Sequence, residues 1–223
     1  MLKIRTSEDI TAAEIKRIAE AGKDPFIGAI LLEYYKEFGE SEAPKYPVMR
    51  LQDAMNPDSA INAEIKKNPV VVLDEPFQVY TIETGDILNY NSGVDLSSIL
   101  KPTTKWFVPV FIHKKARAML TVDYLDGEWK VVSIGMGDIS EKVDKNKKMN
   151  VAAKDTNSKF VRIYPALSDF IVTDIQGNKK IFPFSYSVDA LDLDSRRADS
   201  AGLYEVADVM PHVIDVVRKN ITQ

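Results

Sequence analysis

The stretch from Trp106 to Gly135, WFVPVFIHKKARAMLTVDYLDGEWKVVSIG, constrains the fold more than any other part of the chain. It contains three runs, 105–112, 117–124 and 128–134, that are rich in branched and aromatic residues or alternate in polarity. Such residues favour strands because they suit a pleated, half-buried surface. Asp126-Gly127 separates the last two runs and readily adopts the positive φ angles of a tight hairpin turn. The sequence therefore predicts a three-stranded antiparallel meander with Gly127 at positive φ.

Two residue types refine this prediction. Pro109 has no N–H to donate to a neighbouring strand, so its strand should lie at an edge of the sheet or carry a bulge. Apolar residues occur on both faces of the three strands, which indicates that one face lies against a helix and the other is partly covered. We expect both tryptophans, Trp106 and Trp129, to be buried in the sheet core.

Helices are predicted on both sides of the meander in the sequence. Ser7 can cap a helix over 7–21 that Gly22 closes, and a second helix starts at Asp24-Pro25 and runs to residue 38. The second helix has a wide apolar face, made by Phe26, Ile27, Ile30, Leu31, Tyr34, Tyr35 and Phe38. A third helix covers most of 49–67. A final helix spans 201–220, and Pro211 within it predicts a kink or two shorter helices.

A second group of strands follows the meander, with runs at 159–164, 168–174 and 179–184 and a turn at Gln176-Gly177-Asn178. Shorter strands are expected at 70–73 and 76–82. A shift of about 50 residues places Gly127 on Gly177. Two explanations are open for this match: an internal duplication, or the general likeness of any two antiparallel meanders.

Helices and strands that occur in separate blocks predict an α+β fold, with N-terminal helices packed on curved antiparallel meander sheets and a C-terminal helix. In the order of its elements this fold is similar to cystatin-like and NTF2-like α+β domains, which include both binding proteins and enzymes. We expect one domain over 1–223, with a possible division into two subdomains. The first, 1–149, would hold the helices and the first meander, and the second, 150–223, the second meander and the C-terminal helix.

Composition narrows the classes of function. Among 223 residues, 45% are hydrophobic and 28% charged, with a net charge of −4, so no basic stripe for nucleic acid is expected. No run of about 18 apolar residues predicts a transmembrane segment. The opening MLKIRTSEDI has no apolar core, so we expect a cytoplasmic location by default, or export if a leader has been removed. The chain has no cysteine, which excludes disulfides and thiolate metal sites.

Histidines and acidic residues are the first candidates for chemistry. His113, beside basic residues at the end of a strand, suggests a general base or an anion site, but a charged hairpin connection is the simpler interpretation. His212 is interpreted as a partly exposed helical residue, and two distant histidines do not have metal-ligand spacing. The segment DALDLDSRRAD suggests a calcium site, but it lacks the EF-hand spacing, and its arginines can neutralise its acids: Asp189, Asp192, Asp194 and Asp199.

The remaining motifs also favour structural roles. Asp123 lies near the acidic residues of the hairpin turn, Asp126 and Glu128, and is expected to stay hydrated with them. Glu83 and Asp86 border a loop and are interpreted as solvated. Gly135-Met136-Gly137 lacks the third glycine of a dinucleotide loop. The aromatic residues that could line a pocket are more typical of a core: Tyr34, Tyr35, Phe38, Trp106, Phe107 and Trp129.

These observations favour a non-catalytic binding or protein-interaction module, without catalytic, cofactor-binding or metal-binding residues and without a cofactor. Its partner would be a protein or a small molecule. The alternative is a small-molecule enzyme with a pocket between the 24–38 helix and the 105–135 meander, using Asp123 or His113. A third possibility is a structural subunit that adds a strand to the sheet edge of a partner.

Overall fold

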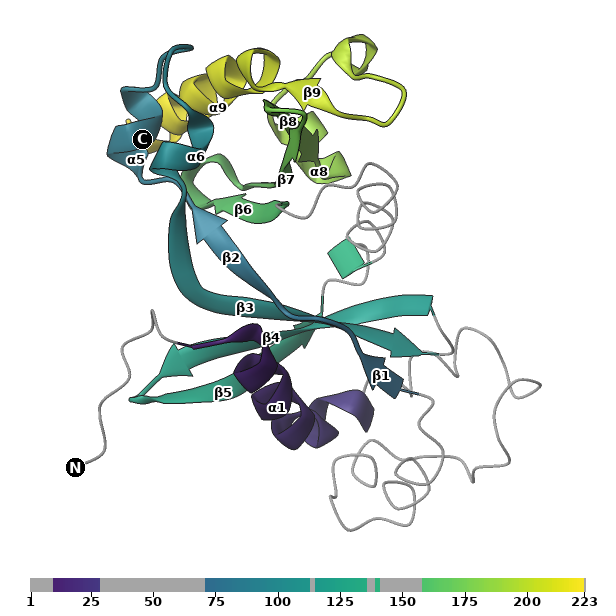
Figure 1. The fold of residues 1–223 in the computed structure, drawn as a ribbon. Coiled ribbons are helices and arrows are strands. Elements are labelled where there is room, and N and C mark those ends of the chain that lie inside the picture. Colours follow the sequence, from purple (N-terminus) through teal and green to yellow (C-terminus); the bar gives the residue numbers. More distant parts are fainter. Residues whose placement is uncertain (1–9, 29–70, 113–114, 136–138, 141–157, 223) are drawn as a thin grey trace. The chain divides into compact units, whose positions relative to one another are not determined.

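The computed structural model describes residues 10–28, 71–112, 115–135, 139–140 and 158–222 (Figure 1). This part has a mixed α/β structure, with a large, mostly antiparallel open sheet and a helix near the C-terminus. None of its helices is both long enough and apolar enough to cross a bilayer.

Contacts between residues divide the chain into two compact units. Unit 1 comprises residues 1–76 and 105–141, and unit 2 comprises residues 77–104 and 142–223. The segment 77–104 therefore groups with the C-terminal part of the chain, whereas the division expected from the sequence placed it with the N-terminal part. That the chain forms separable subdomains stays a prediction.

Unit 1 contains the predicted meander, in the order β5-β4-β3, with β1 antiparallel to β3. The strands are β1 (Val71–Leu73), β3 (Lys101–Ile112), β4 (Lys115–Leu125) and β5 (Glu128–Gly135). Pro109 lies on β3 between two neighbours, so the edge position is wrong. The predicted bulge is present instead, as a register shift between Val110 and Phe111.

The hairpin between β4 and β5 turns at Asp126 and Gly127, whose φ angles are 56° and 86°. Two successive positive φ angles match the right-handed twist of the flanking strands. The predicted turn is therefore confirmed, and Leu125 pairs directly with Glu128 across it.

Helix α1 (Ala12–Gly22) lies against β5 and β4 (Figure 1). Its buried residues Ile15 and Ala19 belong to the core of this unit. Its N-terminus is closed by a capping box, in which Thr11 Oγ1 accepts from the Glu14 N–H at 3.2 Å and Glu14 Oε2 accepts from the Thr11 N–H at 3.0 Å. The helix therefore starts later than predicted, and Ser7 lies outside the described residues. Residues 24–28 are helical, while the rest of the predicted second helix and the third helix, 49–67, lie outside the described part.

The two tryptophans differ in burial. Trp106 on β3 is 8% exposed and belongs to the core of unit 1, as predicted. Trp129 on β5 is partly buried and packs against the same core, so the prediction for this residue is confirmed only in part. The ring of Trp129 lies beside Tyr124, with the centroids 5.4 Å apart. It pairs close to the hairpin turn, where solvent reaches both strands.

Unit 2 contains the second predicted meander. Its strand order is β2-β6-β7-β8-β9, with β2 parallel to β6 and the other pairs antiparallel. The strands are β2 (Phe77–Thr81), β6 (Lys159–Ile163), β7 (Ser168–Ile175), β8 (Asn178–Pro183) and β9 (Tyr204–Glu205). The first residues of β3 lie beside β2, since Thr103 Oγ1 donates to the Val79 carbonyl at 2.7 Å.

Helices complete this unit. They are α5 (Thr84–Leu88), α6 (Leu96–Ile99), α8 (Ser185–Ala190) and α9 (Val206–Ile221), with 3-10 turns η1 (Tyr164–Ala166) and η2 (Ser195–Arg197). Apolar residues of α5, α6 and α9 pack with residues of β6, β7 and β8 in one core. Helix α9 continues through Pro211, so its division into two helices is wrong. Pro211 and Ala207 are both exposed, and Pro211 has no N–H to donate to the Ala207 carbonyl one turn earlier.

The two hairpins share one turn geometry. Gln176 and Gly177 have φ angles of 55° and 85°, almost the values at Asp126 and Gly127. The first hairpin carries a bulge between Thr121 and Val122, whereas the second has a regular register. Turn chemistry accounts for the likeness near the turns, and duplication stays a hypothesis.

Candidate functional site

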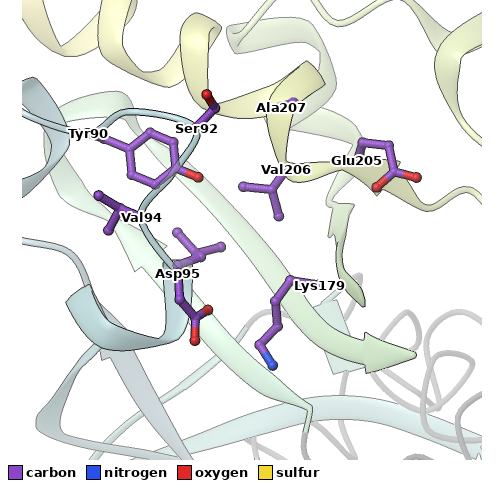
Figure 2. Close-up of a pocket in the computed structure, with 9 residues that line it drawn as sticks. Tyr90, Ser92, Val94, Asp95, Lys179, Glu205, Val206 and Ala207 are labelled. Atoms are coloured by element: carbon purple, nitrogen blue, oxygen red, sulfur yellow. The ribbon is translucent and has the colours of Figure 1, made fainter. Parts of the chain in front are cut away.

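A pocket of about 310 Å³ lies within unit 2 (Figure 2). Its walls come from the connection between α5 and α6, from the start of β8, and from the junction of β9 with α9. The lining residues are Tyr90, Ser92, Val94, Asp95, Leu96, Lys179, Glu205, Val206 and Ala207. The pocket therefore combines one aromatic ring, aliphatic side chains, two carboxylates and one ammonium.

Local hydrogen bonds shape the wall that carries Tyr90 and Asp95. Asn91 makes a turn, in which its Oδ1 accepts from the Gly93 N–H at 3.1 Å and its carbonyl accepts from the Val94 N–H at 3.0 Å. Asp95 then caps α6, because its Oδ1 accepts from the Ser97 N–H at 3.0 Å. Asx turns and caps of this kind fix short polar connections.

The opposite wall is held by strand pairing and ion pairs. Glu205 pairs with Lys180 in the β8–β9 ladder, and their side chains form a salt bridge. The neighbouring Lys179 forms a salt bridge with Asp174 on β7. Both partners, Lys180 and Asp174, lie outside the pocket lining, so the charges of Glu205 and Lys179 are already balanced.

Tyr90 is the residue in this pocket with the most distinctive environment. Figure 2 shows its hydroxyl pointing across the pocket towards Val206. The hydroxyl has no hydrogen-bond partner among the described residues. Burial, and secondly the negative charge of Asp95, raise the pKa of the Tyr90 phenol above its usual range. Tyr90 is therefore neutral at physiological pH and offers both a ring and a hydroxyl to a ligand.

A second polar cluster in unit 2 is saturated by its own partners. Asp169 is 3% exposed, and its carboxylate accepts two hydrogen bonds from Arg162, at 2.7 Å from Nε and 2.5 Å from Nη2. The Tyr186 hydroxyl also donates to Asp169. The Ser187 hydroxyl donates to the Asp169 carbonyl at 2.9 Å and accepts from the Asp169 N–H at 2.8 Å. This cluster ties α8 to β7 and is structural.

The same cluster shifts two pKa values. The hydrogen bond to Asp169 raises the pKa of Arg162, which stays charged. Burial, followed by the hydrogen bond to Asp169, raises the pKa of Tyr186 far above its usual range. Neither group exchanges a proton near neutral pH, so Arg162 and Tyr186 are unsuited to general acid–base catalysis at that pH.

Asp123 differs from its sequence-based interpretation. It is 3% exposed on β4, so the expectation of a hydrated carboxylate is wrong. Its Oδ2 is 2.8 Å from Lys105 Nζ on the adjacent strand β3, and its Oδ1 accepts from the Tyr124 N–H at 2.9 Å. It belongs to a continuous buried run of β4, residues 118–123, and the neighbouring lysine compensates its charge. Asp126 and Glu128 are exposed around Lys130, as expected for turn residues.

Of the other candidate residues, those that the structure describes do not line the pocket. His113, and with it Tyr34, Tyr35 and Phe38, lies outside the described residues. His212 is half-exposed on α9, as predicted. Glu83 and Asp86 share Lys101, whose Nζ is 2.8 Å and 3.4 Å from their carboxylates. The hydrogen bond to Glu83, and to a smaller extent the contact with Asp86, raises the pKa of Lys101.

The acidic segment serves local turns in the structure. Asp194 caps η2 and forms a two-point ion pair with Arg196, which lowers the pKa of Asp194. Asp199 Oδ1 accepts from the backbone N–H groups of Ala201 and Leu203. Within the described residues, no group of three or more potential metal ligands is brought together.

Sequence inspection missed Tyr90, Lys179 and Glu205. Residues 85–93 have no clear periodicity, so their sequence predicts no defined structure. The Asn91 turn and the Asp95 cap are the local signals that identify this connection as ordered. The pairing of β8 with β9, which brings Glu205 to the pocket, has no comparable signal in the sequence.

No protein-family model, curated protein or solved structure matches this chain.

Proposed function

We propose that this protein is a non-catalytic binding module whose ligand site is the pocket of unit 2. The observation that carries the proposal is the half-buried Tyr90, whose hydroxyl faces the pocket without a partner among the described residues. Pockets of about 300 Å³ and more that combine an apolar lining with a few polar groups are typical ligand sites. The ligand is a small molecule or a side chain of a partner protein.

Several polar groups support binding rather than catalysis. Asp169 and Asp123 are the buried carboxylates of the described residues, and each is engaged by a cation from the adjacent strand. A general base needs a proton-accepting atom that can reach a substrate. The alternative, an enzyme pocket between the 24–38 helix and the 105–135 meander, would use Asp123 or His113. The ion pair with Lys105 disfavours that role for Asp123, and His113 lies outside the described residues.

A ligand screen on the full chain tests the proposal. Ligand-observed NMR with a library of small polar and amphipathic compounds should identify binders, and Ala207→Trp should abolish their binding by filling the pocket. Ala207 is exposed at the start of α9, so the fold should tolerate the change. Tyr90→Phe should weaken binders that use the hydroxyl.

The matched control is Ala190→Trp, at an exposed helical position outside the pocket lining. It should leave binding unchanged. Binders that respond equally to both tryptophan substitutions, or not to Ala207→Trp, would refute this pocket as the binding site. Melting curves of each variant show whether it is folded.

A further inference from the structure

We infer that the pocket of unit 2 takes a small organic cation, held between the Tyr90 ring and the Asp95 carboxylate. This inference rests on the proposed function and adds the chemical class of the ligand. It follows from the balance of charges around the pocket and from the aromatic side chain that lines it.

The charged side chains of the pocket lining do not cancel one another. The lining contains two carboxylates, Asp95 and Glu205, and one ammonium, Lys179. Lys179 is bound to Asp174, and Glu205 is bound to Lys180. Asp95 differs from both, because its carboxylate accepts the Ser97 N–H but has no cationic side chain as a partner among the described residues. The pocket therefore keeps one uncompensated negative charge.

The charge of Asp95 acts on the Tyr90 side chain. The charge of Asp95 adds to burial in raising the pKa of the Tyr90 phenol, which places the phenol within the negative field of the carboxylate. An aromatic ring also attracts cations through the negative potential of its face. The two groups therefore favour the same sign of ligand charge.

The lining around the Tyr90 ring is mostly aliphatic. Val94, Leu96 and Val206 add aliphatic surface around the Tyr90 ring. Figure 2 shows the Lys179 ammonium directed away from the Tyr90 ring, so it leaves the ring free. An anion would have only the Lys179 ammonium as a charged partner, and Asp174 already holds that group. An alkylammonium, whose chain can cover the aliphatic residues, fits this lining best.

Three probes of equal length test the inference: n-butylammonium, n-butanol and butyrate. Each is titrated into the isotopically labelled full chain, and binding is followed at the backbone amides of residues 90–96. We expect n-butylammonium to bind at least about fivefold more tightly than n-butanol, an advantage typical of one partly exposed cation site. Butyrate should bind most weakly, and added salt should reduce the advantage of the cation.

Variants assign the effect to its residues. Asp95→Asn removes the charge but keeps an N-cap residue, so α6 should stay folded while the advantage of the cation over n-butanol disappears. Tyr90→Leu should weaken n-butylammonium binding several-fold. Asp192→Asn is the matched control, because Asp192 is an exposed acid of unit 2 outside the pocket lining, and it should change nothing.

The outcomes separate the two proposals. Equal or tighter binding of n-butanol or butyrate, or an advantage of the cation that survives Asp95→Asn, would overturn the cation inference and leave the binding module intact. No shift at residues 90–96 with any probe would also overturn it. The library screen with Ala207→Trp decides the binding module independently, since that screen includes neutral and anionic compounds.

Discussion

At the scale of single residues, Asp169 is a buried carboxylate of unit 2 whose charge needs a partner. Its side chain is 4% exposed and depends on Arg162 for compensation of its charge. Removing one partner of a buried ion pair leaves an uncompensated charge. Arg162→Ala should therefore lower the free energy of unfolding by about 3 kcal/mol, at the lower end of the usual range because Arg162 keeps some solvent contact.

Urea denaturation measures this loss. Arg196→Ala is the control, because the Arg196–Asp194 pair has the same two-point geometry but Arg196 is 88% exposed. Exposed pairs contribute little, so the control should change stability by less than about 1 kcal/mol. Equal effects of the two substitutions would show that Asp169 is not dependent on Arg162.

Tyr186 predicts a loss of stability in alkali. Burial and the hydrogen bond to Asp169 raise its pKa in the folded state, so the folded protein keeps the phenol proton when the unfolded chain releases it. This contribution is fully present below about pH 10, the ordinary tyrosine value, and is lost as the pH rises further towards the folded value. Between about pH 9 and 11, the wild type should lose more stability than Tyr186→Phe.

Urea midpoints at several pH values measure the difference, and absorbance of tyrosinate follows the ionisation. Tyr164→Phe, at an exposed tyrosine of the same unit, should behave like the wild type. Parallel pH profiles for the wild type and Tyr186→Phe would contradict the assigned hydrogen bond.

Leu167 combines two unfavourable features at one position. It is 75% exposed, and its φ of 49° and ψ of 39° lie in the left-handed region. Asparagine tolerates this conformation better than leucine, and little apolar burial is lost on replacement. Leu167→Asn should therefore stabilise the protein by about 0.5 kcal/mol in urea titrations. A clear loss of stability would show that the leucine side chain makes contacts that its exposure does not suggest.

At the scale of elements, the hairpin turn of unit 1 depends on Gly127. Its φ of 86° is a conformation that a β-branched residue adopts only with strain, although nothing would contact an added Cβ. Gly127→Val should thus cost about 2 kcal/mol through the backbone alone. Gly135→Val is the matched control in the adjacent strand: it also has open space around its Cβ, but it does not have a positive φ, so thermal melts should show it near the wild type.

The elements that sequence predicts well are those with local causes. Asp126-Gly127 determines its turn by the φ angles it permits, and the strands of both meanders follow from runs of branched and aromatic residues. Thr11 was missed as the start of α1, although Thr11-x-x-Glu14 is the sequence signature of a capping box, and Ser7, with Ile10 three residues on, does not have it. The exposure of Pro211, which lets α9 continue, depends on tertiary structure.

The pocket and the burial of Asp123 could not be predicted from local sequence patterns, because both depend on tertiary structure. From the sequence, Asp123 is predicted to be a hydrated acid beside other acids. In the structure, the register of β4 against β3 buries it next to Lys105. The pocket joins Tyr90 to Glu205, which are distant in sequence and meet through the packing of α5 and α9 in one core. No periodicity or motif encodes such a meeting.

At the scale of the whole molecule, the chain builds two separate cores. The first contains residues of α1, β1, β3 and β4, including Leu120, and the second contains residues of β6, β7, β8 and α9, including Met210. No described residue belongs to both cores. Each unit also combines segments from distant parts of the sequence, because 77–104 belongs to unit 2 and 105–141 to unit 1.

Two cores without shared residues predict two unfolding transitions. Leu120 and Met210 are both almost completely buried, at 0% and 1% exposure, so truncation to alanine should cost each unit about 2–5 kcal/mol. In differential scanning calorimetry, Leu120→Ala should lower the temperature of one transition and Met210→Ala that of the other. β3 runs from unit 2 into unit 1, and this shared strand is the route by which the units would couple if they unfold together. A single transition that both substitutions lower to the same extent would show that the two cores unfold as one cooperative structure.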